Sequence, residues 1–223
     1  LLNGEEVHID NLNAAIKMGI GMVYQHFMLV PSLTVTENLV IGMEPRKDGI
    51  FYDSAAATKM VREAAAKYNF DLDPDAKIRD LSVGQKQKVE ILKVLISGDK
   101  IVILDEPTAG LDPAGCRGVL ENIAAYRRET GSAVLLVTHS MDDAARIADR
   151  LIVFHDGHVA FDGAPAEVFA HTQALLDIGL DVPQSARIAQ ALRDRGIALP
   201  PSIYTLEQLT NALLAVGKEA GVC

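Results

Sequence analysis

Three apolar runs along the chain each end at polar side chains. The runs cover residues 20–24, 101–104 and 133–138. They are followed by Gln25, by Asp105 and Glu106, and by His139. Near-continuous apolar runs that alternate with helical stretches are typical of parallel strands covered on both faces, so the pattern predicts an α/β fold. Ligands bind beyond the carboxyl ends of such strands, and we therefore expect these polar residues to converge on one site.

A long helical insert separates the first two predicted strands. Residues 55–68 are helical by composition, and residues 82–95 are helical by the spacing of their apolar positions. These two helices predict a helical subdomain over residues 43–98. Residues 1–42 and 99–163 then form the core that surrounds it.

The last third of the chain begins with a helix and a tight hairpin. Ser140, with Asp143 three residues later, can cap a helix that runs to about residue 149. The segment His155-Asp156-Gly157 has the Asp-Gly signature of a tight β-hairpin, here between strands at 151–154 and 158–161. Residues 164–223 are expected to form a C-terminal helical extension, with helices at 166–176, 184–195 and 205–216.

Composition narrows the class of protein. The 223 residues are 49% hydrophobic, 5% aromatic and 23% charged, which excludes disordered and collagen-like chains. The formal net charge of -9 has the wrong sign for binding a nucleic-acid backbone, so no nucleic-acid partner is expected. Cys116 and Cys223 are too few for a disulfide framework, and we expect thiols in a reducing, intracellular compartment.

Two further features concern the ends and the membrane. No stretch approaches the roughly 18 consecutive apolar residues of a membrane span. The chain begins at Leu1 and its first residues lack the sections of a signal peptide. We expect a fragment that starts inside a domain.

Asp105, Glu106 and Pro107 form the most specific local pattern. Mg²⁺ prefers oxygen ligands and keeps several waters, so a single carboxylate at a strand end suits it, and Asp105 is the candidate. Glu106 is the candidate to orient or polarise an attacking water beside a γ-phosphate. The alternative is that the three residues only end a strand and begin a turn.

A second candidate site is the segment Leu81, Ser82, Val83, Gly84 and Gln85. Ser82 and Gln85 have the spacing of a capping box, which any helix could use. The same helix start offers a hydroxyl, backbone N–H groups and a glycine, which together can bind an anion such as a γ-phosphate. Both interpretations stay open.

Three single residues have weaker signals. Gln25 could contact metal and water, although an isolated glutamine is usually inert. His139 could contact a terminal phosphate from the end of its strand, although a lone histidine is more often structural. Asp112 before Pro113 is an ordinary helix N-cap, whichever function holds.

Taken together, these motifs resemble the ATP-binding cassette (ABC) ATPases of transporters. Gln25 matches the Q-loop, residues 81–85 the signature, Asp105 and Glu106 the Walker B motif, Asp112 the D-loop and His139 the switch histidine. The resemblance implies a P-loop NTPase fold that binds ATP and Mg²⁺.

In the mechanism that it implies, Asp105 and Gln25 contact the metal, Glu106 orients water, and His139 and Ser82 stabilise charge on the γ-phosphate. It also implies a second ATPase subunit in a head-to-tail dimer, with Ser82 and Gly84 acting across the interface. The further partners are integral membrane subunits, at the cytoplasmic face of the cell membrane.

This sequence departs from the family pattern at two places. Val83 stands where the signature usually has glycine, and no G-x-x-x-x-G-K-[ST] phosphate loop occurs in the 223 residues. We therefore expect this chain by itself to be inactive. A non-hydrolysing interaction module is the alternative of a different class.

Two segments resemble different importer branches. Residues 21–38 are similar to ATPases of nucleoside and simple-sugar uptake, whereas the tail from residue 178 resembles ATPases of energy-coupling factor (ECF) transporters, which import vitamins and transition metals. Because helical tails vary more between branches than the cassette does, the ECF interpretation is favoured. A nucleoside or sugar importer, or a recombined chain, stays open. A DNA-repair or translation ATPase is disfavoured by the acidic charge and the single short cassette.

Overall fold

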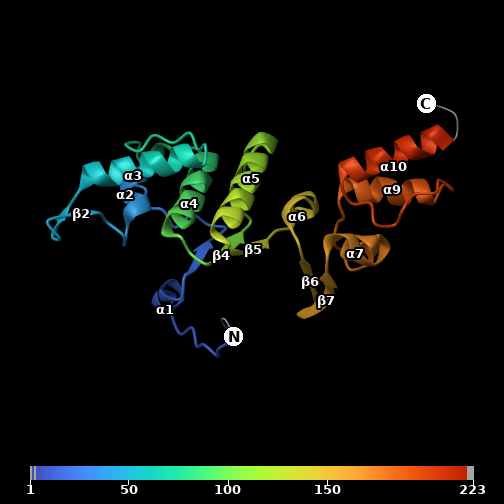
Figure 1. Cartoon of the computed structure of the whole chain (residues 1–223), viewed down its shortest axis with the longest axis horizontal. Coiled ribbons are helices and arrows are strands. Elements are labelled where there is room, and N and C mark those ends of the chain that lie inside the picture. Colours follow the sequence, from blue (N-terminus) through green and yellow to red (C-terminus); the bar gives the residue numbers. More distant parts are fainter. Residues whose placement is uncertain (1, 3, 220–223) are drawn as a thin grey trace. The chain divides into compact units, whose positions relative to one another are not determined.

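The computed structural model describes residue 2 and residues 4–219, in two units (Figure 1). The units are Leu1–Val137 and Thr138–Cys223, and each is described by itself. Cys116 is in no disulfide within the described residues, and Cys223 lies outside them. No helix in residues 4–219 combines the length and apolar character that a membrane span requires.

A parallel three-stranded sheet lies at the centre of the first unit. Its strands are β1 (Ile20–Val23), β4 (Ile101–Asp105) and β5 (Ala133–Val137), in the order β1-β4-β5. Val23 pairs with Leu104, and Leu104 with Leu136. The three strands predicted from the apolar runs are therefore present, and the α/β class with a parallel sheet is confirmed.

The sheet is covered unequally on its two faces. Val23, Val102 and Leu104 are buried in a cluster with apolar residues of α4 (Val83–Ser97) and α5 (Pro113–Thr130). The prediction of strands buried on both faces is wrong for part of the other face, because alternate strand residues point away from these helices. The exposed residues there are Met22, Leu135 and Val137.

The two helices predicted between β1 and β4 are present, and a further helix precedes residue 43, so the bounds 43–98 of a separate subdomain stay a prediction. The helices α2 (Val35–Val40), α3 (Ser54–Lys67) and α4 pack against one another, as Figure 1 shows. The insert also contains the short hairpin of β2 (Arg46–Lys47) and β3 (Phe51–Tyr52) and the 3₁₀ turn η1 (Ile78–Asp80). These short elements of the insert were not predicted, because their sequences show no clear apolar period. The same holds for α1 (Leu12–Lys17), which precedes β1.

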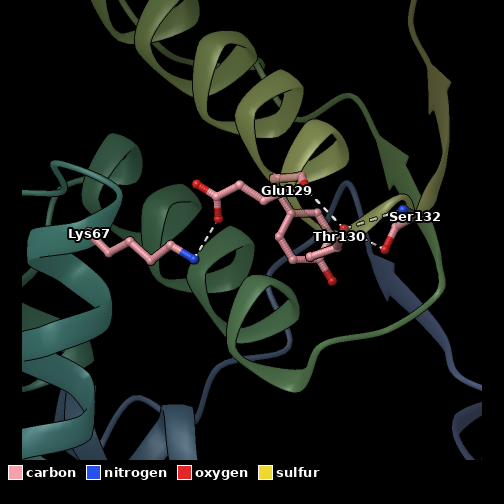
Figure 2. A network of polar contacts seen from close by, with 5 residues as sticks. Lys67, Glu129, Thr130 and Ser132 are labelled. Atoms are coloured by element: carbon pink, nitrogen blue, oxygen red, sulfur yellow. Dashed lines mark hydrogen bonds and ion pairs between the residues drawn. The ribbon is translucent and has the colours of Figure 1, made fainter.

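Polar contacts connect the end of α3 with α5 (Figure 2). Lys67 Nζ lies 2.6 Å from Glu129 Oε2, and Asn122 Nδ2 donates to the carbonyl of Tyr68 at 2.7 Å. At the turn from α5 to β5, Ser132 Oγ donates to the carbonyl of Asp99 at 2.8 Å. The helical insert is thus joined to the sheet region through side chains as well as through the chain.

The second unit contains the predicted hairpin and the helical tail. The strands β6 (Leu151–His155) and β7 (His158–Gly163) form the predicted tight hairpin, and Asp156 and Gly157, both at positive φ (48° and 76°), make its two-residue turn, with His155 belonging to β6. Ser140 caps α6 (Met141–Ile147), because the N–H of Asp143 donates to Ser140 Oγ at 3.3 Å. The helices that follow are α7 (Pro165–Ala170), α8 (Thr172–Asp177), α9 (Gln184–Arg193) and α10 (Leu206–Glu219).

One predicted helix, 166–176, is wrong in its continuity. The helix is interrupted at His171, which lies between the end of α7 and the start of α8. At the break Thr172 Oγ1 donates to the carbonyl of Phe169 at 2.8 Å, so a side chain replaces part of the helical backbone bonding. Phe169 and Leu175 stay buried in one cluster on the two sides of the break.

Candidate functional site

The carboxyl ends of the parallel strands bring the first group of candidate residues to one edge of the sheet. Asp105 pairs in register with Val137, and Val23 pairs with Leu104. Gln25 therefore follows β1 at the edge where β4 ends in Asp105 and continues into Glu106. The ends of these strands are neighbours in the sheet, and the convergence of the polar side chains on one site stays a prediction.

Glu106 has an unusual backbone conformation. Its φ is +48°, in the left-handed region that non-glycine residues seldom adopt. The N–H of Glu106 donates to the carbonyl of Val137 at 2.9 Å, and its carbonyl accepts from the N–H of Ala109 at 3.0 Å. These bonds hold the turn directly after β4. Such strain costs roughly 1–3 kcal/mol and is concentrated at functional sites, which agrees with a role for this turn.

Gln25 lies in an exposed bend after β1. Three residues later the backbone N–H of Met28 donates to Glu90 Oε1 at 2.5 Å. Glu90 lies on α4 with only 6% of its surface exposed, and its burial raises the pKa of the carboxyl, opposed by the bond from Met28 and by the charge of Lys93. The bend that contains Gln25 is thus hydrogen-bonded to α4, the helix that begins within residues 81–85.

Residues 81–85, called the signature segment below, begin α4 with a complete capping box. Ser82 Oγ accepts from the N–H of Gln85 at 3.3 Å, and Gln85 Oε1 accepts from the N–H of Ser82 at 3.0 Å. Ser82 and Val83 are exposed, while Leu81, Gly84 and Gln85 are partly buried. The capping interpretation is confirmed. Because the capped helix start remains exposed, it is also accessible to an anion. The anion-binding interpretation stays a prediction.

The signature segment packs against the turn that precedes α5. A Cβ atom on Gly110 would lie 3.1 Å from Val83 Cγ1, and one on Gly84 would lie 3.1 Å from Leu111 Cδ2. Asp112 next caps α5 by accepting from the N–H of Gly115 at 2.7 Å, as its position before Pro113 predicted. Two candidate segments far apart in the sequence are therefore in contact within the first unit.

His139 belongs to the second unit, between the end of β5 and the cap of α6. Its side chain is exposed. Beside it, the N–H of Ser140 donates to Thr138 Oγ1 at 3.0 Å, which fixes the backbone on one side of the histidine. The predicted approach of His139 to Glu106 stays a prediction.

Two buried side chains that hold the segment after Gln25 escaped the sequence reasoning. Glu90 holds Met28, and Asn38 on α2 holds Val30 by accepting from its N–H at 2.7 Å and donating to its carbonyl at 3.1 Å. A usable signal existed for Glu90, because it is a charged residue inside the apolar series of α4. Asn38 gave no comparable signal.

The donors near the strand ends fit Mg²⁺ by their chemistry. Asp105 offers a carboxylate and Gln25 an amide oxygen, which are hard oxygen ligands. In the part of the chain that the structure describes, no group of three His, Cys, Asp or Glu side chains could hold a metal. A protein site with one carboxylate agrees with this, since Mg²⁺ in nucleotide sites takes most of its ligands from phosphates and water.

Comparison with known proteins supports the predicted family. A family model described as ABC transporter matches residues 1–109. The energy-coupling factor transporter ATP-binding protein EcfA2 of Clostridium perfringens (strain 13 / Type A) is 37% identical over 220 residues, which cover 93% of this chain and 75% of that protein. The chain belongs to the ATP-binding proteins of ABC transporters.

Other relatives of this ABC ATPase chain lie in both predicted branches. EcfA2 of Symbiobacterium thermophilum is 38% identical over 206 residues, which cover 90% of this chain and 69% of that protein. The nucleoside import ATP-binding protein NupA of Lactococcus lactis subsp. cremoris is 44% identical over 156 residues. That match covers 70% of this chain but only 30% of NupA.

A solved structure is similar to this ABC ATPase chain as well. It is cbiO1 from Clostridium perfringens, described as part of the ABC transporter complex cbiONQ. The TM-score is 0.59 with 28% sequence identity, and the match covers 75% of this chain and 66% of cbiO1. The fold is accordingly that of the P-loop NTPases, as the resemblance implied.

Proposed function

We propose that this chain is an ATP-hydrolysing subunit of an ABC importer, with ECF-type uptake of a vitamin or transition metal as the favoured case. One observation carries the proposal. In a chain of this family, β4 ends in Asp105 and Glu106 at the sheet edge where β1 leads to Gln25. The matches to EcfA2 proteins cover about nine-tenths of this chain, against 70% for NupA, and this favours the ECF branch.

The proposed chemistry assigns one role to each side chain. Asp105 and Gln25 would hold Mg²⁺, which, when bound, supplies charge neutralisation at the phosphates. The Glu106 carboxylate accepts a hydrogen bond from the attacking water and so directs the water oxygen at the γ-phosphorus. As the water oxygen bonds to that phosphorus, the bond from phosphorus to the β–γ bridging oxygen breaks, and the water proton passes by way of Glu106 to the phosphate, leaving ADP and phosphate. His139 contributes a hydrogen bond to the γ-phosphate oxygens.

The signature segment has its role in a pair of subunits. The exposed start of α4, with Ser82 and Gly84, is proposed to face the nucleotide of a second ATPase subunit, because a helix N-terminus favours negative charge. Integral membrane subunits complete the transporter, and the chain lies at the cytoplasmic face of the membrane. ATP-driven closure of the two ATPase subunits would move the membrane subunits.

The test of the proposal is the substitution Glu106→Gln in the assembled transporter, with a phosphate-loop segment supplied ahead of residue 1, because the 223 residues by themselves are expected to be inactive. We expect ATP turnover to fall by about 100-fold or more while Mg-ATP binding is kept, because glutamine has a similar shape but is a far weaker base. Glu121→Gln, an exposed change on α5, is the matched control and should leave turnover unchanged. Full turnover in Glu106→Gln would contradict the assigned role.

Nucleoside import is the second candidate, favoured by the 44% identity to NupA. Uptake assays distinguish the two branches. Transport of a labelled nucleoside by a complex that contains this chain, without transport of vitamins or metals, would replace the ECF assignment. The opposite outcome would support it.

A further inference from the structure

Glu90 forms the connection between two parts of the proposed site. Within the described residues, the chain that leaves β1 at Val23 is next held at Met28, whose N–H donates to Glu90 Oε1 at 2.5 Å. Gln25 lies between these two points. The exposed bend at residues 24–27, called the Gln25 loop below, is therefore fixed at one end by the sheet and at the other by a side chain of α4.

A second side chain fixes the chain just beyond this point. Asn38 on α2 accepts from the N–H of Val30 at 2.7 Å and donates to its carbonyl at 3.1 Å. Asn38 is 1% exposed and Glu90 is 6% exposed, so both anchors are buried side chains, and each bond is partly buried. The two anchors are alike in kind but come from different helices.

Of these two anchors in the described residues, the one on α4 lies on the same helix as the signature segment. Val83 and Glu90 are seven residues apart, which is about two helical turns, so they lie on the same side of α4. The start of the same helix packs against Gly110 and Leu111 before α5. If α4 moves as a rigid element over these two turns, a shift at Val83 would move Glu90 and, through its bond, the backbone of Met28.

We propose that Glu90 is a positioning residue that couples the Gln25 loop to the signature segment. In this proposal, Glu90 orients the amide of Gln25 toward the proposed metal and water site only when the start of α4 is packed against Gly110 and Leu111. This inference rests on the proposed function. Its competitor is a purely structural role, in which Glu90 only accepts the hydrogen bond from the N–H of Met28.

The first experiment measures the connection without measuring activity. Hydrogen exchange at the Met28 amide is compared in the wild-type complex, Glu90→Ala, Glu90→Gln and the matched control Asn38→Ala. Glu90→Ala should speed Met28 exchange by about tenfold, and Glu90→Gln should restore protection because its amide oxygen also accepts. Asn38→Ala should speed exchange at Val30 and leave Met28 protected. Unchanged Met28 exchange in Glu90→Ala would overturn the proposal.

The second experiment separates positioning from structure. In the assembled transporter, Glu90→Ala should lower kcat by about tenfold and raise the Mg²⁺ concentration needed for half-maximal turnover, because partners that orient metal ligands have effects of this size. Glu90→Gln should restore both values. Asn38→Ala should lower stability to a similar degree but keep both values within about twofold of wild type.

Two outcomes of the second experiment count against the inference and are distinguishable. If Gln25→Ala slows turnover but Glu90→Ala only lowers stability, Glu90 is structural and this proposal alone fails. If Gln25→Ala leaves turnover and Mg²⁺ dependence unchanged, the role of Gln25 in the proposed function fails, and this inference fails with it.

Discussion

At the scale of the residue, the first unit contains a carboxyl group whose burial is costly. The N–H of Met28 and the charge of Lys93 favour the ionised form of Glu90, but burial outweighs both and raises its pKa above the ordinary value. The folded chain therefore holds a proton on Glu90 over a pH range in which the unfolded chain has lost it. The contribution of Glu90 to stability falls as the pH rises through that range.

A prediction follows for Glu90→Gln in the purified chain. The variant has no titrating group at this position, and its amide oxygen can still accept from Met28. We expect the free energy of unfolding of the variant to exceed that of wild type near neutral pH, and the difference to shrink as the pH falls into the carboxyl range.

Urea unfolding between about pH 4 and pH 7 measures the difference. Glu121→Gln is the control, because Glu121 is exposed on α5. A Glu90→Gln variant that is less stable than wild type at neutral pH would show that the ionised carboxylate is needed for the bond to Met28.

Residues also differ in how well the sequence predicted them. Ser82, Gln85 and Asp112 form the caps that their spacing indicated, because capping depends on local geometry. The left-handed φ of Glu106 was not predictable, since it depends on bonds to Val137 and Ala109. The bond between Glu90 and Met28 joins residues 62 positions apart, which local patterns cannot show.

At the scale of the element, contact between the signature segment and the turn before α5 depends on small residues. Gly110 has φ +74°, and a Cβ atom there would lie 3.1 Å from Val83 Cγ1. Gly118 lies inside α5, and a Cβ atom there would have nothing within 4 Å. Substitution by alanine is therefore expected to change the free energy of unfolding in opposite directions at the two glycines.

Gly110→Ala should lower the free energy of unfolding by about 1–2 kcal/mol, because an L side chain at this φ is strained and meets Val83. Gly118→Ala should raise it by about 1 kcal/mol, because alanine is the better helix former. Thermal and urea unfolding of both variants measure the two values. Equal effects of the two substitutions would mean that the turn before α5 relaxes away from Val83.

Elements with strong local patterns were predicted well, and those decided by packing were not. The parallel strands, α3, α4 and the hairpin at Asp156 and Gly157 have clear periodicity or turn residues. The six-residue helices α1 and α2 are too short to show a period. The break between α7 and α8 depends on a side-chain bond from Thr172, which the helical composition of this stretch hid.

At the scale of the whole molecule, the sequence predicted the family because its motifs occur in the right order, and relatives covering most of the chain confirm it. The exposed apolar face of the sheet was not predictable, since exposure depends on what else packs there. The roles of the signature segment in a pair of subunits are not visible in one chain. Testing these roles requires a substitution that keeps the helix cap at Ser82 but disturbs its proposed contact with the nucleotide.

Ser82→Asp makes that separation. Aspartate is as good an N-cap as serine and is favoured at a helix N-terminus, so the free energy of unfolding should stay within about 0.5 kcal/mol of wild type. Its negative charge would repel a γ-phosphate held by the second subunit, and ATP turnover of the assembled transporter should fall by about tenfold or more. Ser82→Asn, an uncharged cap of similar size, is the control and should lose less activity. If Ser82→Asp keeps both stability and turnover, Ser82 acts only as a helix cap and the nucleotide must contact other residues of the signature segment.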